Sequence, residues 1–140
     1  MKFFQKELQI SPKKRGFHLI TNEIIMAIPE IKDISIGQLQ VFIKHTSASL
    51  TINENADASV RADFESHFNK MVPENMQYYI HTYEGPDDMP AHIKSAMMPV
   101  SLQIPVAQGQ MRLGTWQGIY LFEHRRAQHV RRVAAHFATS

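Results

Sequence analysis

Short runs in which apolar and polar residues alternate are the feature that most constrains the fold of this chain. Leu39, Val41 and Ile43 alternate with polar neighbours, and Leu50 and Ile52 repeat the pattern. A period of two is typical of a strand with one buried face. Further strand-like runs lie at residues 102–104, 119–122 and 133–137. So many short strands do not fit a parallel sheet with alternating helices, and they favour antiparallel sheets.

Three segments break this alternation and predict helices. Residues 57–71 carry Val60, Phe64, Phe68 and Met71 at helical spacing. A shorter helix is expected where Thr21 or Asn22 caps a segment that stops near Pro29, and another at residues 89–98 with Pro90 in its first turn. The sequence therefore predicts an α+β fold: an antiparallel, jelly-roll-like β-sandwich with two or three flanking helices, forming a single domain over residues 1–140.

Composition excludes several classes of partner and site. The chain has no cysteine, so it can form neither a disulfide nor a thiolate zinc site, and any metal must be held by imidazole, carboxylate or water. A net charge of +2 is too small for binding to a nucleic-acid backbone. No stretch approaches the ~20 apolar residues of a membrane span. The segment Met1 to Glu7 becomes polar too soon for a signal peptide, so we expect a cytoplasmic location.

A histidine followed by hydroxyl side chains ends one predicted strand. His45 falls on the same face as Ile43, which turns its ring inward, and Thr46, Ser47 and Ser49 follow it. Both ring nitrogens then need partners, because an unpaired buried polar group costs about 1–3 kcal/mol. The partner could be a metal or a substrate. It could also be a backbone carbonyl and a neighbouring hydroxyl, as for an ordinary core histidine.

A second cluster brackets three carboxylates between His81 and His92. With His45, these two histidines could supply three nitrogen ligands and leave an open coordination position, as catalytic metal sites do. Nearby carboxylates could orient the imidazoles. The alternative is a solvated acidic loop in which Asp87 and Asp88 cap the next helix.

Two residues of the segment 114–124, Glu123 and Trp116, are candidates for a chemical or binding role. Glu123 shares its face with aliphatic residues, so if buried it needs a cation or a donor, or its pKa rises as a general acid or base requires. Otherwise it lies at a solvated strand end. Trp116 could stack on a flat heterocycle or simply pack in a core or interface.

Four arginines lie near the C-terminal end of the sequence: Arg125, Arg126, Arg131 and Arg132. They could clamp a phosphate, or they could lie along a solvated strand edge.

Three separated blocks of the chain resemble the YjbQ family, also called the secondary thiamine-phosphate synthase family. They are HTSASLTINENAD from His45, YEGPDDMPAHIKSAM from Tyr83 and GTWQGIYLFEH from Gly114. The resemblance implies a β-sandwich assembled as a homotrimer, with histidine ligands for a divalent metal near a subunit boundary. The family's histidines fall on the ligand set His45, His81 and His92. Its acidic positions match Glu123 and Asp88, although a loop of variable length leaves Asp87 as the alternative to Asp88.

The resemblance also implies a reaction: weak thiamine-phosphate synthesis, in which a pyrimidine diphosphate joins a thiazole phosphate and pyrophosphate leaves. We expect a metal-dependent enzyme whose substrate is a small phosphorylated molecule, with zinc as the metal or magnesium for a diphosphate. The alternatives are a non-catalytic trimeric module that binds a metal or an anion, and a phosphoester hydrolase with thiamine-phosphate synthesis as a side activity. The expected catalytic residues are Asp88 and Glu123, and the expected substrate contacts are Ser47, Asn55, Trp116 and Gln117.

Overall fold

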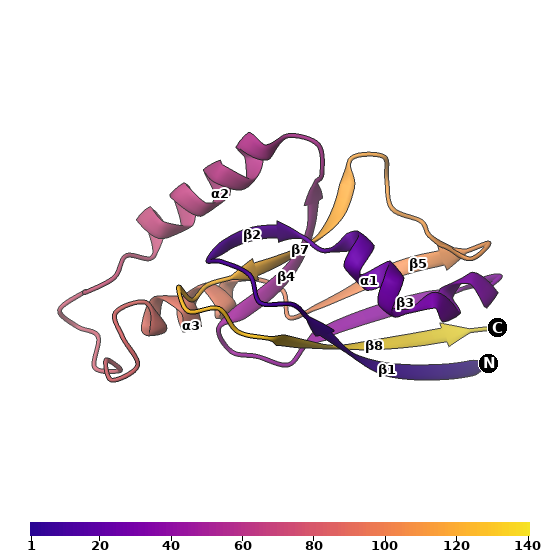
Figure 1. Ribbon diagram of the computed structural model, residues 1–140, viewed down its shortest axis with the longest axis horizontal. Helices are drawn as coiled ribbons and strands as arrows, with labels where there is room; N and C mark the ends of the chain where they lie inside the picture. The colour runs from indigo at the N-terminus through magenta and orange to yellow at the C-terminus, as the bar shows by residue number, and fades with distance from the viewer.

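Two antiparallel sheets enclose the core of the computed structural model, which describes residues 1–140 (Figure 1). The larger sheet has the strand order β1-β8-β3-β5-β6, with bounds β1 (Lys2–Ile10), β8 (Arg131–Thr139), β3 (Ile36–Ile43), β5 (Ser101–Ala107) and β6 (Gln110–Met111). The smaller has the order β2-β7-β4, with bounds β2 (Gly16–Leu19), β7 (Gln117–Glu123) and β4 (Ala48–Glu54). The predicted α+β class with antiparallel sheets is confirmed.

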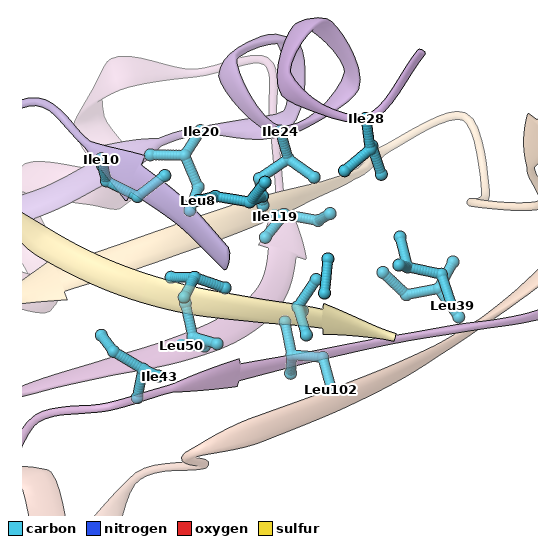
Figure 2. Packing of buried hydrophobic residues seen from close by; sticks show 14 of the residues in the cluster. Leu8, Ile10, Ile20, Ile24, Ile28, Leu39, Ile43, Leu50, Leu102 and Ile119 are labelled. Atoms are coloured by element: carbon cyan, nitrogen blue, oxygen red, sulfur yellow. The ribbon is translucent and has the colours of Figure 1, made fainter. Parts of the chain in front are cut away.

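The register of β3 shows why the alternating residues form the core. Leu39 lies opposite Phe137 of β8, Val41 opposite Ala135 and Ile43 opposite Val133, and all six are buried. Side chains of both sheets and of the first helix meet in one apolar cluster, part of which is drawn in Figure 2. Burial of these side chains from water is the main favourable contribution to folding.

Strand β7 departs from alternation because it is covered on both faces. Ile119 and Leu121 face the main core, whereas Tyr120 and Phe122 form a second apolar cluster with Phe17. Helix α2 (Ala58–Met71) packs its Phe64 and Phe68 onto this second cluster. The smaller sheet is therefore a middle layer, with the larger sheet on one side and α2 on the other (Figure 1). As a result, the polar residues that end β7 are buried too.

The three predicted helices are present. Helix α1 (Thr21–Ala27) is followed by the 3-10 turn η1 (Pro29–Asp33), and α3 spans Asp88–Met97. Asp57 caps α2, since its Oδ1 accepts a 2.8 Å hydrogen bond from the Ser59 amide. Thr21 does not cap α1 as expected: its Oγ1 accepts instead from the Ile119 amide at 2.9 Å and ties the helix to β7. None of the helices has both the length and the apolar character needed to cross a bilayer.

Candidate metal centre

The start of α3 gathers two imidazoles around one carboxylate. Asp88 and His92 are four residues apart and so share a face of the helix. His92 Nε2 lies 3.2 Å from Asp88 Oδ2, and His81, from the loop before α3, donates from Nε2 to the same oxygen at 2.8 Å. One ligand atom from each of the three residues lies within 4.8 Å of the other two. Two of the three predicted histidine ligands are thus brought together, and Asp88 joins them.

The hydrogen bond made by Nδ1 of His92 determines the tautomer of the neutral ring. Nδ1 donates a 2.9 Å hydrogen bond to the Thr46 carbonyl, which can only accept, so Nδ1 carries a proton. In the neutral ring Nε2 is then a bare lone pair, and it faces an oxygen of Asp88. Two acceptors at 3.2 Å are stabilised by a positive charge between them, whether a proton or a metal cation.

Arg125 fastens the acidic turn that carries Asp88. Its Nη1 donates to Asp88 Oδ1 at 2.6 Å, its Nε to Asp87 Oδ2 at 3.0 Å and its Nη2 to the Glu84 carbonyl at 2.8 Å. With Oδ1 held by the guanidinium, Oδ2 of Asp88 is directed at the imidazoles. Neither predicted alternative for Arg125 holds: it is neither a phosphate clamp nor a solvated strand edge, because internal acceptors occupy all three of its donor atoms.

The two neighbouring aspartates have different tasks. Asp87 Oδ2 accepts from Arg125 and from the Arg126 amide at 2.9 Å and does not reach the histidines. Burial raises the pKa of Asp87, but these hydrogen bonds outweigh it and the pKa lies below its usual range. Asp87 is the N-cap residue of α3, yet its side chain makes no capping hydrogen bond. The expected capping role is therefore wrong, and Asp88 is the aspartate at the histidines.

His45 lies outside the cluster. Pairing of β3 with β8 continues past Ile43, because the Lys44 amide donates to the Arg132 carbonyl at 3.0 Å. This continuation places the His45 ring against β8, where Nε2 accepts from the Arg132 amide at 2.8 Å. Burial, followed by the charges of Arg131 and Arg132, lowers the pKa of His45. The structure thus differs from the predicted set of three histidines, since the partner of this ring nitrogen is a backbone amide.

Glu123 is buried with its cation. Arg131 donates from Nε and Nη2 to the two carboxylate oxygens, each at 2.6 Å, and Nη2 also donates to the Ser47 carbonyl at 3.2 Å. This is the first of the outcomes that its apolar strand face predicts. Both carboxylate oxygens of Glu123 are bound by the buried guanidinium. A general acid or base would need one of them free. Ser47 contributes its carbonyl to the same interaction.

The other predicted substrate contacts lie at the opposite end of the smaller sheet. Ala48 pairs with Glu123 and Glu54 pairs with Gln117, so six residues, or about 20 Å, of strand separate the two ends. Asn55 donates to the carbonyls of Thr115 and Gln117 at 3.3 and 3.1 Å. The side chain of Gln117 accepts from the Gly114 amide at 2.8 Å, and Trp116 is 66% exposed. The structure groups Asn55, Trp116 and Gln117 together, away from the histidines.

Three buried polar residues have no counterpart among the predicted site residues: Ser49, His124 and Lys94. Ser49 Oγ and His124 Nε2 are 2.8 Å apart, and burial, followed by the charges of Lys94 and Arg131, lowers the pKa of His124 to about 3. Lys94 is 3% exposed and burial lowers its pKa. The sequence could have pointed to Lys94, because helical spacing places it on the same side of α3 as Asp87. The sequence does not mark His124 as buried, because its burial depends on the packing of helix α2 over the end of β7.

A small cavity adjoins the outer histidine. It has a volume of about 220 Å³, and His81, Tyr79, Met76 and Met89 are among its lining residues. Cavities with apolar walls and a few polar groups are where small ligands bind. This cavity gives the cluster access to a ligand of modest size.

Known proteins resemble this chain over nearly its whole length. Residues 6–140 match the family model described as UPF0047 protein YjbQ-like. UPF0047 protein YjbQ of Salmonella typhimurium (strain LT2) is 54% identical over 123 residues, which cover 88% of each chain. UPF0047 protein YjbQ of Escherichia coli O157:H7 is 50% identical over 133 residues, covering 95% of this chain and 96% of that protein.

Solved structures show the same architecture. An uncharacterized conserved protein of the YjbQ/UPF0047 family from Clostridium acetobutylicum is 36% identical, with a TM-score of 0.82 over 95% of this chain and 99% of that one. A YbjQ-like protein of unknown function from Sulfolobus solfataricus is 18% identical, with a TM-score of 0.85 over 99% of both chains. The second likeness concerns the fold alone.

Proposed function

The chain belongs to the YjbQ-like UPF0047 family, and on this premise we propose that it is a metal-dependent enzyme acting on a small phosphorylated molecule, with the metal held by His81, Asp88 and His92. Two imidazole nitrogens and one carboxylate oxygen are a donor set that zinc accepts with a position left open. Magnesium prefers a shell made of oxygen ligands. Zinc is therefore the proposed metal.

The observation that carries this proposal is the orientation of the His92 ring. Its Nδ1 donates to the Thr46 carbonyl, so Nε2 faces Asp88 Oδ2 at 3.2 Å, the side on which a metal cation would be shared by the two. Imidazoles that bind metals are commonly oriented in this way by a backbone carbonyl on the other ring nitrogen. Arg125 does the same for Asp88 by holding its second oxygen.

The chemistry assigned to the site follows from its groups. A divalent cation bound there would supply positive charge to phosphate oxygens and polarise them. The protein positions the reactants: Arg125 keeps the acidic turn rigid, and the cavity beside His81 admits a small ligand. Tyr79 in the wall of that cavity offers a flat surface for a heterocycle, whereas Trp116, the predicted stacking residue, is exposed at the other end of the smaller sheet.

Thiamine-phosphate synthesis is the reaction we propose to test first, because the cluster could stabilise the departing pyrophosphate. Hydrolysis of a phosphoester at the same site is the second candidate. It is favoured by the limited volume of the cavity beside His81, about 220 Å³, which suits one small substrate better than two.

Turnover assays test this function. Protein purified without a histidine tag is assayed with the two thiamine precursors and with a panel of phosphate esters, with and without zinc or magnesium. We expect zinc-dependent turnover that Asp88→Asn abolishes and that Asn55→Ala, at the far end of the sheet, leaves unchanged. Absence of turnover on every substrate in the presence of bound zinc would reject the enzyme and favour a module that only binds the metal.

Assembly as a homotrimer is a further part of the proposal. The loop between α2 and α3 exposes Tyr78, Ile80 and Tyr83 at 72%, 94% and 100%, next to His81. Exposed large apolar side chains that lie together mark association surfaces. Light scattering coupled to size-exclusion chromatography is expected to give three times the mass of the chain, and a monomer would contradict this assembly.

A further inference from the structure

A second cavity is lined by residues of α1, η1 and the β5–β6 hairpin. Its volume is about 530 Å³, against about 220 Å³ for the cavity beside His81. The four apolar residues of its lining are Ile25, Ile31, Met111 and Leu113. Ile31 belongs to the main core, and Met111 and Leu113 pack against it, so the cavity wall continues the apolar interior. Binding sites for small molecules have this size and this apolar character.

The two walls of this cavity are fixed to each other by the backbone. The hairpin loop consists of Gln108 and Gly109, whose amides donate to the carbonyls of Ser35 and Ile34, each at 2.8 Å. A Cβ on Gly109 would lie 2.8 Å from the Lys32 carbonyl, so the close approach of the loop to η1 requires glycine. The cavity is thus formed in the free chain, and a ligand does not have to order its walls.

Gln108 has a backbone conformation that glutamine rarely adopts. Its φ is +54° and that of Gly109 is +73°, so both residues of the turn are left-handed. Asparagine or glycine is usual at the first of these positions. Backbone strain of this kind is concentrated at ligand sites. Gln108 lines the cavity, and what glutamine provides there over glycine is an amide that can donate to a ligand and accept from it.

Lys32 is the only charged residue of the lining. Its acidic neighbours in η1, Glu30 and Asp33, do not line the cavity, and Glu30 pairs with Lys6. Because Lys32 is exposed, its charge adds little affinity, but it favours an anionic head group over a cationic one. The lining therefore suits a molecule that is apolar over most of its length and negatively charged at one end.

We propose that this cavity is a binding site for a small carboxylate with an apolar chain, with the carboxylate facing Lys32 and Gln108. Burial of the chain against the apolar lining supplies most of the affinity, and the lysine and the amide donate to the carboxylate oxygens. None of the lining residues belongs to the histidine cluster, and in Figure 1 α1 lies to the right of α3. The site therefore holds whether or not the proposed enzymatic function does.

Calorimetric titration of the full chain with octanoate tests the site. Acetate has the charge without the chain, and octylamine has the chain with the opposite charge. We expect saturable binding of one octanoate per chain, no binding of acetate, and binding of octylamine about threefold weaker than that of octanoate. No saturable octanoate binding would overturn the proposal, and equal affinity for octylamine would overturn the preference for an anion.

Two adjacent residues of α1 offer a matched pair of variants. Ile25 lines the cavity and is 38% exposed, whereas Met26 is 81% exposed and is not part of the lining. Ile25→Glu places a carboxylate in the wall and is expected to weaken octanoate binding about tenfold or more. Met26→Glu adds the same charge to the same helix and is expected to leave the affinity unchanged. Equal octanoate affinity in a folded Ile25→Glu variant would overturn the proposal.

Gln108→Gly is a further variant that preserves the turn, since glycine accepts its φ without strain. We expect a thermal midpoint at least as high as that of the wild-type chain, measured by circular dichroism, and octanoate binding about threefold weaker. Undiminished binding would overturn the role of the Gln108 amide. Light scattering on Ile25→Glu and Met26→Glu identifies the other occupant: a lower mass of Ile25→Glu alone, without octanoate binding by the wild type, would assign the cavity to a contact between chains.

Discussion

Polar residues lie at both ends of the β4–β7 ladder, but they are buried at one end and accessible to solvent at the other. At the Ala48–Glu123 end, helices and strand β8 cover the polar groups, and Glu123, Arg131 and His124 are each at most 3% exposed with protein partners. At the Glu54–Gln117 end, the Asn55 side chain bonds to backbone carbonyls of residues 115 and 117, and Trp116 remains exposed. A buried polar group that loses its partner has no water to replace it. The covered end is therefore where each interaction is worth most.

The largest difference between the ends is expected from the buried ion pair. Arg131→Met leaves the Glu123 carboxylate charged and unpaired in the interior and should lower the free energy of unfolding by about 3–5 kcal/mol. Urea denaturation measures this loss. The double variant with Glu123→Gln should regain much of the loss, because no uncompensated charge remains. A single Arg131→Met variant as stable as the wild type would contradict the contrast between the ends.

His124 should make stability depend on pH at the covered end. Its pKa is about 3 when folded and near its ordinary 6.5 when unfolded, so the unfolded chain binds an extra proton between these values. Stability is fully present above pH 6.5 and is lost as the pH falls, by up to about 1.4 kcal/mol per pH unit. Denaturation curves from pH 7 to pH 5 measure this slope, above the range in which carboxylates titrate.

The variant His124→Phe keeps an aromatic ring and removes the proton site. It should be less stable at pH 7, since Ser49 loses its partner, but its slope between pH 7 and pH 5 should be much shallower. His45, which is half-buried, shifts in the same direction and should account for the remaining slope. An unchanged slope in His124→Phe would show that the buried histidine is not the source.

Asn55→Ala tests the open end. It removes two hydrogen bonds to the carbonyls of Thr115 and Gln117 that water can replace, so the expected loss is about 1 kcal/mol. The urea midpoint measures it. A loss as large as that of Arg131→Met would erase the distinction between the two ends.

Trp116→Ala should have the smallest effect. The side chain is 66% exposed and makes no side-chain hydrogen bond, so we expect a change in the free energy of unfolding within about 0.5 kcal/mol. Thermal unfolding followed by circular dichroism measures it. A loss of several kcal/mol would place the indole in a core or an interface. The open end would then contribute as much to the free energy of unfolding as the covered end.

The residues show how far the sequence could predict this molecule. Alternation in β3 predicts its buried face, and helical spacing with Asp57 predicts α2. Strand β1 was not predicted, because of its residues only Leu8 and Ile10 are buried and its place in the fold comes from pairing with β8. His81 and His92 could be singled out from the loop they bracket.

Long-range pairing decides the rest of the site. Strand parity turns His45 inward but does not reveal the Arg132 amide that its ring nitrogen accepts from. The choice between Asp87 and Asp88 depends on Arg125, which lies 38 and 37 residues away along the chain, respectively. Local patterns contain no record of such contacts.

The most direct test is zinc binding measured by calorimetry on chelator-treated protein, comparing the wild-type chain with His92→Ala and His45→Ala. We predict one site in the wild type, loss of measurable binding in His92→Ala, and retained affinity in His45→Ala, because the His45 ring bonds to strand β8. Equal zinc binding by the wild type and His92→Ala would contradict it, as would loss of the site in a folded His45→Ala variant.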